Sequence, residues 1–294
     1  MPVLVPPTIS FLTDYGLTDE FVGVVKGVIR QLAPEALVID ISHDVAPHDV
    51  RAGSLTLVRA VQYLPDGVIL AVVDPGVGTA RRAIAVEAGD DGMVFVGPDN
   101  GLLAPAVAIL GGARRAVELS NTDLHLMAPG PTFAGRDLFA PVAAHLANGV
   151  PITDVGHEID PAGLMPGMLP LSQAEDGQVT GEVLWVDRFG NAQLNIDPAD
   201  IADLGDTVSL RFGTTHRTAR RADAYGAIRG GEIGLVVDSY GLVSVCLDRR
   251  SASVELGLHA GMAVTLAAPS DDSSPGSTPT RVVTPVQLGP RRAD

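Results

Sequence analysis

Two segments in the first half of the chain combine acidic side chains with glycines directly after apolar runs. They are residues 13–19 (TDYGLTD) and residues 74–82 (DPGVGTARR). An ionised carboxylate has two acceptor oxygens, so Asp14 in the first segment is suited to holding a ribose diol. The alternative for Asp14 and Asp19 is to cap the helix that follows, and taken alone Asp19 favours the cap.

The second segment places a carboxylate and a guanidinium seven positions apart. Its two glycines let the backbone approach a ligand closely, and Asp74 and Arg81 can fold back on one another across such a loop. It is not a dinucleotide fingerprint, because the third glycine position holds Arg81, and it lacks the Gly-Lys-Ser/Thr ending of a phosphate loop. A structural ion pair remains the simpler interpretation of these two residues by themselves.

Other polar segments carry weaker signals. Residues 131–137 (PTFAGRD) lead into an amphipathic helix, and residues 187–191 (DRFGN) and 238–241 (DSYG) are typical of turns. The histidines and aspartates between His43 and Asp49 match no metal-ligand spacing, which favours a polar turn over a metal site. The Gly-x-Ser-x-Gly motif of serine hydrolases is absent from the sequence.

The elements that must position these segments alternate between strands and helices in residues 1–164. Apolar runs predict strands at 8–13, 36–41, 68–73, 83–87 and 93–96, and helical spacing predicts helices at 20–32, 52–63 and 100–110. Such alternation is typical of an α/β domain with a mainly parallel sheet, in which ligands bind beyond the carboxyl ends of the strands.

The pattern changes after residue 164. Prolines and a glycine indicate a linker over residues 165–177, and residues 178–267 predict a smaller all-β domain, a barrel. Its expected strands are 178–187, 207–212, 232–237, 243–247 and 263–266. Residues 268–294 are rich in Pro, Ser, Thr and Asp, and we expect them to form a disordered tail.

Composition narrows the possible partners. The formal net charge of −15 over 294 residues argues against nucleic acid and anionic membranes, which attract basic surfaces. The single cysteine, Cys246, excludes an internal disulfide and is expected to be a small buried hydrophobe. Because no secretory signal and no apolar run of roughly 18–20 residues is visible, a cytoplasmic protein with a small-molecule substrate is expected.

Five ordered segments carry a resemblance to a known family. They are residues 11–16 (FLTDYG), 74–79 (DPGVGT), 97–101 (GPDNG), 132–137 (TFAGRD) and 189–191 (FGN). The chain resembles the S-adenosylmethionine hydroxide adenosyltransferases over residues 8–267; these are relatives of fluorinating and chlorinating enzymes that use the same substrate. The resemblance implies an α/β domain followed by a β-barrel, a homotrimer with active sites between subunits, and hydrolysis of S-adenosylmethionine to adenosine and methionine.

The resemblance also implies roles for individual residues. Asp14 would hold the ribose hydroxyls, and Asp74 and Arg81 match two members of the family's hydrolytic trio. The third member is a histidine, and Ala134 occupies its position here. The remaining substrate-binding residues that the resemblance implies are Asp19 and Asn191 for the methionine portion, Phe133 and Tyr225 near the nucleoside, and Ser239 at the border of the methionine group.

The reaction itself makes few demands. The sulfonium leaves as neutral methionine, so neither a metal nor a cofactor is expected. Our hypothesis is that Asp74 and Arg81 orient the attacking water and that Asp74 takes its proton late. Two alternatives remain: a halogenase of the same fold, and a protein that binds S-adenosylmethionine with little catalysis, which Ala134 makes more credible.

Overall fold

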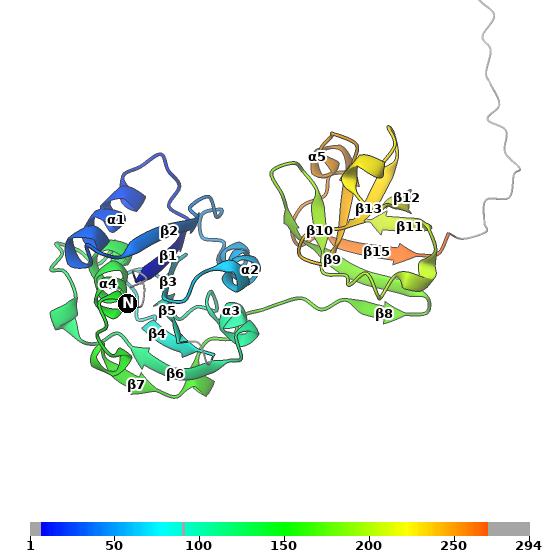
Figure 1. Ribbon diagram of the computed structural model, residues 1–294. Coiled ribbons are helices and arrows are strands. Elements are labelled where there is room, and N and C mark those ends of the chain that lie inside the picture. Colours follow the sequence, from blue (N-terminus) through cyan, green and yellow to red (C-terminus); the bar gives the residue numbers. More distant parts are fainter. Residues whose placement is uncertain (1–6, 90–91, 270–294) are drawn as a thin grey trace, which may run out of the picture. The chain divides into compact units, whose positions relative to one another are not determined.

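The computed structural model describes residues 7–89 and 92–269, which form two compact units with the division between Leu171 and Ser172 (Figure 1). This division falls inside the predicted linker, 165–177. Part of that linker is a strand, β8 (Gln173–Glu175), which pairs with the next strand through a turn at Asp176 and Gly177. Both turn residues have positive φ, as a tight hairpin requires, so Gly177 belongs to a hairpin and not to a linker.

The first unit contains a seven-stranded sheet in the order β2-β1-β3-β5-β4-β6-β7. Strands β2, β1, β3 and β5 are neighbours that pair in parallel, whereas β4 runs antiparallel to β5 and β6, and β7 antiparallel to β6. Five of the seven strands therefore share one direction, which confirms a mainly parallel sheet. The bounds are β1 Thr8–Thr13, β2 Leu37–Ser42, β3 Val68–Val72, β4 Ala83–Ala88, β5 Met93–Pro98, β6 Ala113–Glu118 and β7 His157–Ile159.

Helices cover both faces of this sheet because successive strand side chains point to opposite sides. Phe11 of β1 belongs to the same buried cluster as Ile29 of α1 (Phe21–Leu32) and Val142 of α4 (Ala140–Ala147). Its neighbour Leu12 belongs to the cluster formed with α2 (Val50–Ala60) and α3 (Ala104–Ile109), so the unit has three layers. A π-helical turn, Gly135–Phe139, leads into α4.

The start of α1 corrects one prediction. Asp19 was favoured as the helix cap, but Glu20 occupies the N-cap position and no side chain caps the helix there. Asp19 is exposed one residue earlier. The cap interpretation of Asp19 is therefore wrong: the chain bends into the helix one residue later than the spacing of polar residues indicates.

The second unit is a closed seven-stranded barrel, as predicted. Strand β10 pairs with both β14 and β9, which joins the two ends of the sheet and leaves β8 outside the closed ring. The core inside holds Leu194, Val245 and Val264 among other aliphatic side chains. The bounds are β9 Gln178–Val186, β10 Ala192–Leu194, β11 Thr207–Phe212, β12 Thr215–Arg221, β13 Ile233–Val237, β14 Val243–Leu247 and β15 Ala263–Ala267, with a short helix, α5, at Ala252–Leu256.

Three further predictions concern single features. Cys246 is fully buried in the barrel domain, as expected. Within residues 7–89 and 92–269, no helix is long and apolar enough to cross a membrane. The predicted tail, 268–294, lies outside the described residues except for its first two positions.

Candidate active site

The candidate site lies where β1 and β3 end. These strands are parallel neighbours, so the loops that follow Thr13 and Val72 leave the same edge of the sheet. A cavity of about 250 Å³ opens there, in the place expected for ligands of such sheets. Its lining residues are Asp14, Tyr15, Phe21, Pro47, His48, Asp74, Val77, Thr132, Phe133, Ala134 and Gly135.

Asp74 and Arg81 form the contact that their spacing predicts. Arg81 Nε donates to both carboxylate oxygens of Asp74 at 2.9 and 3.0 Å, and Nη2 lies 2.5 Å from Oδ2. The two side chains are only 5% and 15% exposed, and the guanidinium stacks 5.1 Å from the centre of the Phe139 ring. Charge-assisted bonds from a fork-shaped donor fix the plane of the carboxylate, whose remaining lone pairs can accept from a molecule in the cavity.

Asp14 is held by a segment that follows β2. Its Oδ2 accepts a hydrogen bond of 2.8 Å from the backbone N–H of His48, a residue with φ of 69°. The other carboxylate oxygen stays available to a ligand, because an ionised carboxylate accepts on both oxygens. The neighbouring Gly16 has φ of 69° and donates its N–H to the backbone carbonyl of His43 at 2.8 Å.

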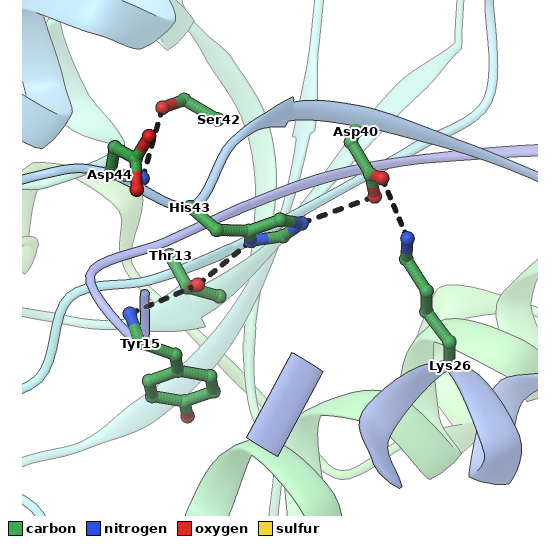
Figure 2. A network of polar contacts seen from close by, with 7 residues as sticks. All are labelled: Thr13, Tyr15, Lys26, Asp40, Ser42, His43 and Asp44. Carbon is green, nitrogen blue, oxygen red and sulfur yellow. Dashed lines mark hydrogen bonds and ion pairs between the residues drawn. The ribbon is translucent and has the colours of Figure 1, made fainter. Parts of the chain in front are cut away.

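A polar network, buried at Thr13 and His43 and partly exposed at Asp40 and Lys26, holds the end of β1 (Figure 2). Thr13 Oγ1 and His43 Nδ1 are 2.8 Å apart, and His43 Nε2 lies 3.1 Å from Asp40 Oδ1. Lys26 Nζ of α1 donates to the second oxygen of Asp40 at 2.6 Å. Thr13 Oγ1 also accepts the backbone N–H of Tyr15 at 3.2 Å, so the network extends to the residue beside Asp14.

Three aromatic rings form one wall of the cavity. Phe133 meets Phe21 edge to face at 5.1 Å between ring centres, and Tyr15 packs 5.8 Å from each of them. The Arg136 guanidinium lies over the Phe133 ring at 5.0 Å. Rings packed in this way give the cavity an apolar wall on which a heteroaromatic base can pack.

Ala134 separates this cavity from a larger hollow. It lines both the 250 Å³ cavity and a second one of about 710 Å³, which also contacts Arg81 and His125. Burial lowers the pKa of His125, and its Nε2 is buried without a hydrogen-bond partner among the described residues. The methyl group of Ala134 leaves room on this side for a larger side chain.

The remaining predicted residues lie elsewhere. Asp19 does not line the cavity. In the barrel, the Asn191 amide donates to Asp187 at 2.7 Å, and Ser239 is exposed in the turn that follows β13. Gln193 of β10 donates to Asp238 at 2.7 Å, which brings the two turns to the same end of the barrel.

Tyr225 and a tryptophan lie near the same turns. Tyr225 is 44% exposed, and its pKa is raised by burial first and then by electrostatic interaction with Cys246, Asp238 and Asp187. The Trp185 ring packs edge to face on Tyr240 at 6.5 Å. Asn191, Tyr225 and Ser239 therefore gather at one end of the barrel.

The sequence prediction missed several lining residues of the cavity. Tyr15 follows Asp14 directly, so its membership in the same loop was the signal that could have identified it. No sequence signal identified the lining residues Phe21, Pro47 and His48. The packing of α1 brings Phe21 to the cavity, and the course of the chain after β2 brings Pro47 and His48 there.

Together these features define a two-domain protein: an α/β domain with a carboxylate- and aromatic-lined cavity at the carboxyl edge of its sheet, followed by a closed β-barrel. The model of the SAM hydroxide adenosyltransferase N-terminal domain matches residues 9–156, and the model of the C-terminal domain of the same family matches residues 181–265. The chain belongs to this family.

Curated relatives match most of the chain. The (R)-S-adenosyl-L-methionine hydrolase of Salinispora tropica is 48% identical over 255 residues, 87% of this chain and 95% of the relative. The enzyme of the same name from Thermus thermophilus is 41% identical, and the match covers 88% of this chain and 98% of the relative. A fluorinase of an Actinoplanes species is more distant, at 27% identity, and the match covers 90% of this chain and 99% of the relative.

A solved structure shares the architecture. The crystal structure of a conserved protein of Thermotoga maritima has a TM-score of 0.82 and 37% identity, and it covers 88% of this chain and 99% of the other.

Proposed function

We propose that this protein hydrolyses S-adenosyl-L-methionine to adenosine and L-methionine by attack of water at the ribose C5′. The observation that carries the proposal is the Asp74–Arg81 pair, placed at the sheet edge where the cavity also presents Asp14 and Phe133. Relatives with 41–48% identity over most of the chain are named hydrolases of this substrate, which supports the same reaction here.

In this proposal the cavity of the first unit holds the nucleoside. The free oxygen of Asp14 accepts from the ribose hydroxyls, and Phe133 packs near the nucleoside. By the family resemblance, Tyr225 at one end of the barrel also packs near the nucleoside. Asn191 and Asp19 contact the methionine portion, and Ser239 borders the methionine group. The family resemblance favours a cytoplasmic homotrimer in which active sites lie between subunits.

The chemistry balances without a cofactor. The water oxygen forms a bond to C5′ while the C5′–S bond breaks. The electron pair of the C5′–S bond goes to sulfur, so the sulfonium group departs as neutral methionine. The water becomes acidic only as its oxygen bonds to carbon, and Asp74 accepts the proton at that stage and releases it to solvent. Holding the water in line with the breaking bond supplies much of the rate acceleration.

The charge of Asp74 favours water over halide. A carboxylate about 4 Å from a halide costs roughly 4 kcal/mol at an effective dielectric constant near 20, close to a thousandfold in occupancy. Arg81 offsets part of this repulsion, so the value is an upper bound. Water carries no charge and can donate a hydrogen bond to the same carboxylate.

The test is product analysis in oxygen-18 water with S-adenosylmethionine. We expect adenosine that carries one heavy oxygen at its 5′-hydroxyl, together with unlabelled methionine. The same reaction is run with and without chloride, and a chlorinated nucleoside in place of adenosine would establish a halogenase. If calorimetry shows that S-adenosylmethionine binds but no product forms after hours, the protein is a binding protein and not a hydrolase.

A further inference from the structure

The phenol of Tyr15, the residue that follows Asp14, packs among the aromatic rings of the site. Its ring packs 5.8 Å from both Phe21 and Phe133, which also contact each other, and its hydroxyl lies close to the backbone of Gly135. A Cβ added to Gly135 would lie 2.2 Å from the hydroxyl oxygen, so a side chain at position 135 would have to displace the hydroxyl. The hydroxyl therefore lies beside the short Ala134–Gly135 segment of the cavity lining.

Tyr15 lines the same cavity as the carboxylates of Asp14 and Asp74. Burial raises the pKa of Tyr15, the charges of Asp14 and Asp74 raise it further, and Arg81 opposes them. The phenol is therefore neutral at physiological pH and keeps both a donor and an acceptor. Within the described part of the chain, the hydroxyl makes no hydrogen bond, which leaves both functions to a molecule in the cavity.

The loop that carries Tyr15 is anchored at its backbone. Thr13 Oγ1 accepts the Tyr15 N–H, and the same oxygen contacts His43, whose ring is 3% exposed and bonded to Asp40 (Figure 2). The backbone carbonyl of His43 accepts from Gly16 on the other side of Tyr15. Two contacts of one residue, His43, thus hold the backbone on both sides of Tyr15.

We propose that the Tyr15 hydroxyl holds the attacking water jointly with Asp74, an inference that rests on the proposed hydrolysis. The Asp74 carboxylate only accepts, so by itself it binds one hydrogen of a water and leaves the molecule free to turn. The phenolic oxygen accepts the second hydrogen, and a water lone pair is then directed at C5′. Tyr15 is a catalytic residue in this arrangement, and His43 is a positioning residue.

The first test is Tyr15→Phe, which removes a single oxygen and leaves the ring contacts in place. We expect kcat to fall about tenfold with KM for S-adenosylmethionine within twofold, since the lost hydrogen bond is made to the water and not to the substrate. Tyr63→Phe is the matched control, because Tyr63 is 75% exposed and outside the cavity; it should keep both constants. Thermal unfolding of both variants checks that they fold.

The second test changes His43, which contacts Thr13 at the base of the Tyr15 loop, and leaves the phenol itself in place. Asparagine at position 43 places its amide near the location of Nδ1 and can retain the Thr13 contact, whereas glutamine reaches toward Asp40 and cannot retain it. We expect His43→Gln to lose at least about threefold more kcat than His43→Asn at equal melting temperature, since only the first lacks the Thr13 hydrogen bond.

The outcomes separate the inference from the function on which it rests. An active wild type with unchanged kcat in Tyr15→Phe would overturn the inference alone, as would a tenfold rise in KM with kcat unchanged, which would place the hydroxyl on the substrate. A wild type that forms no adenosine would overturn both.

Discussion

Asp74→Asn changes the centre of the proposed mechanism while nearly preserving its shape. The amide retains one oxygen for Arg81 but replaces the other acceptor by a donor, which faces guanidinium N–H groups. Arg81, 15% exposed and bonded to Asp74 at 2.9 Å through Nε, then keeps its charge without a counter-ion. The variant therefore perturbs both catalysis and stability, and the two effects have to be measured separately.

The size of each effect follows from the geometry. Removing one partner of a buried ion pair costs about 3–5 kcal/mol, and the retained oxygen reduces this to roughly 2 kcal/mol. For a domain of this size, such a loss lowers the melting temperature by about 4–8 °C. Loss of the proton acceptor and of the orienting charge should lower kcat by at least about a hundredfold.

Asp99→Asn is the matched control. The Asp99 side chain is 3% exposed and pairs with Arg82 at 2.8 Å through Nε. The pair lies directly after β5 and directly before β4, outside the 250 Å³ cavity. We expect a comparable loss of melting temperature by far-ultraviolet circular dichroism, with adenosine release per folded protein within twofold of wild type.

The role of Asp74 is tested by the rate of adenosine release, which is measured by chromatography at saturating substrate. Full turnover by Asp74→Asn would refute the assignment of Asp74 as the group that orients and deprotonates water. A hundredfold loss in both variants would refute it as well, because the effect would then reflect stability of the sheet and not the chemistry of the cavity.

Three further predictions test neighbouring features. Ala134→His should raise kcat about tenfold by adding a polar contact to the water; an unchanged rate in the adenosine assay would show that position 134 has no catalytic part. Gly135→Ala should reduce kcat at least about tenfold, since its Cβ would lie 2.2 Å from the Tyr15 hydroxyl and must displace it; a fully active variant in the same assay would contradict the close approach. Burial raises the pKa of Cys246 to about 12, so at pH 8 about one thiol in ten thousand is ionised. A thiol reagent monitored by absorbance should therefore react only after unfolding, and rapid labelling of the native protein would be inconsistent with this burial.

Much of the fold was predictable wherever strands are continuous apolar runs. β3 is buried at all five positions, as a central strand of a parallel sheet must be, and its sequence shows this directly. β12 (THRTARR) and β6 (ARRAVE) escaped prediction because their charged side chains conceal the few buried positions, Ala219 in one and Ala116 and Val117 in the other. β10 has three residues, too few for a periodic signal, and its buried Gln193 is satisfied by Asp238, which is distant in sequence.

In the site, too, contacts between residues close in sequence were predictable, whereas contacts between distant residues were not. The Asp74–Arg81 contact is local, within a nine-residue loop, so its spacing sufficed to predict it. The hydrogen bond from His48 to Asp14 joins residues 34 positions apart, and only the packing of β2 beside β1 brings them together. Tyr15 illustrates the same limit, because the glycine that makes room for its hydroxyl lies in a segment far along the chain.

The chain's single tryptophan gives the two halves of the protein different optical signatures. Trp185 belongs to β9 and contacts Tyr240 at the end of the barrel that carries Asn191 and Ser239. Indole emission therefore reports on the barrel and its turns, whereas the α/β domain contributes no indole signal. A titration that quenches or shifts this emission would register the arrival of a ligand at those turns, and a denaturation curve recorded by emission would follow the barrel independently of the sheet that carries Asp74.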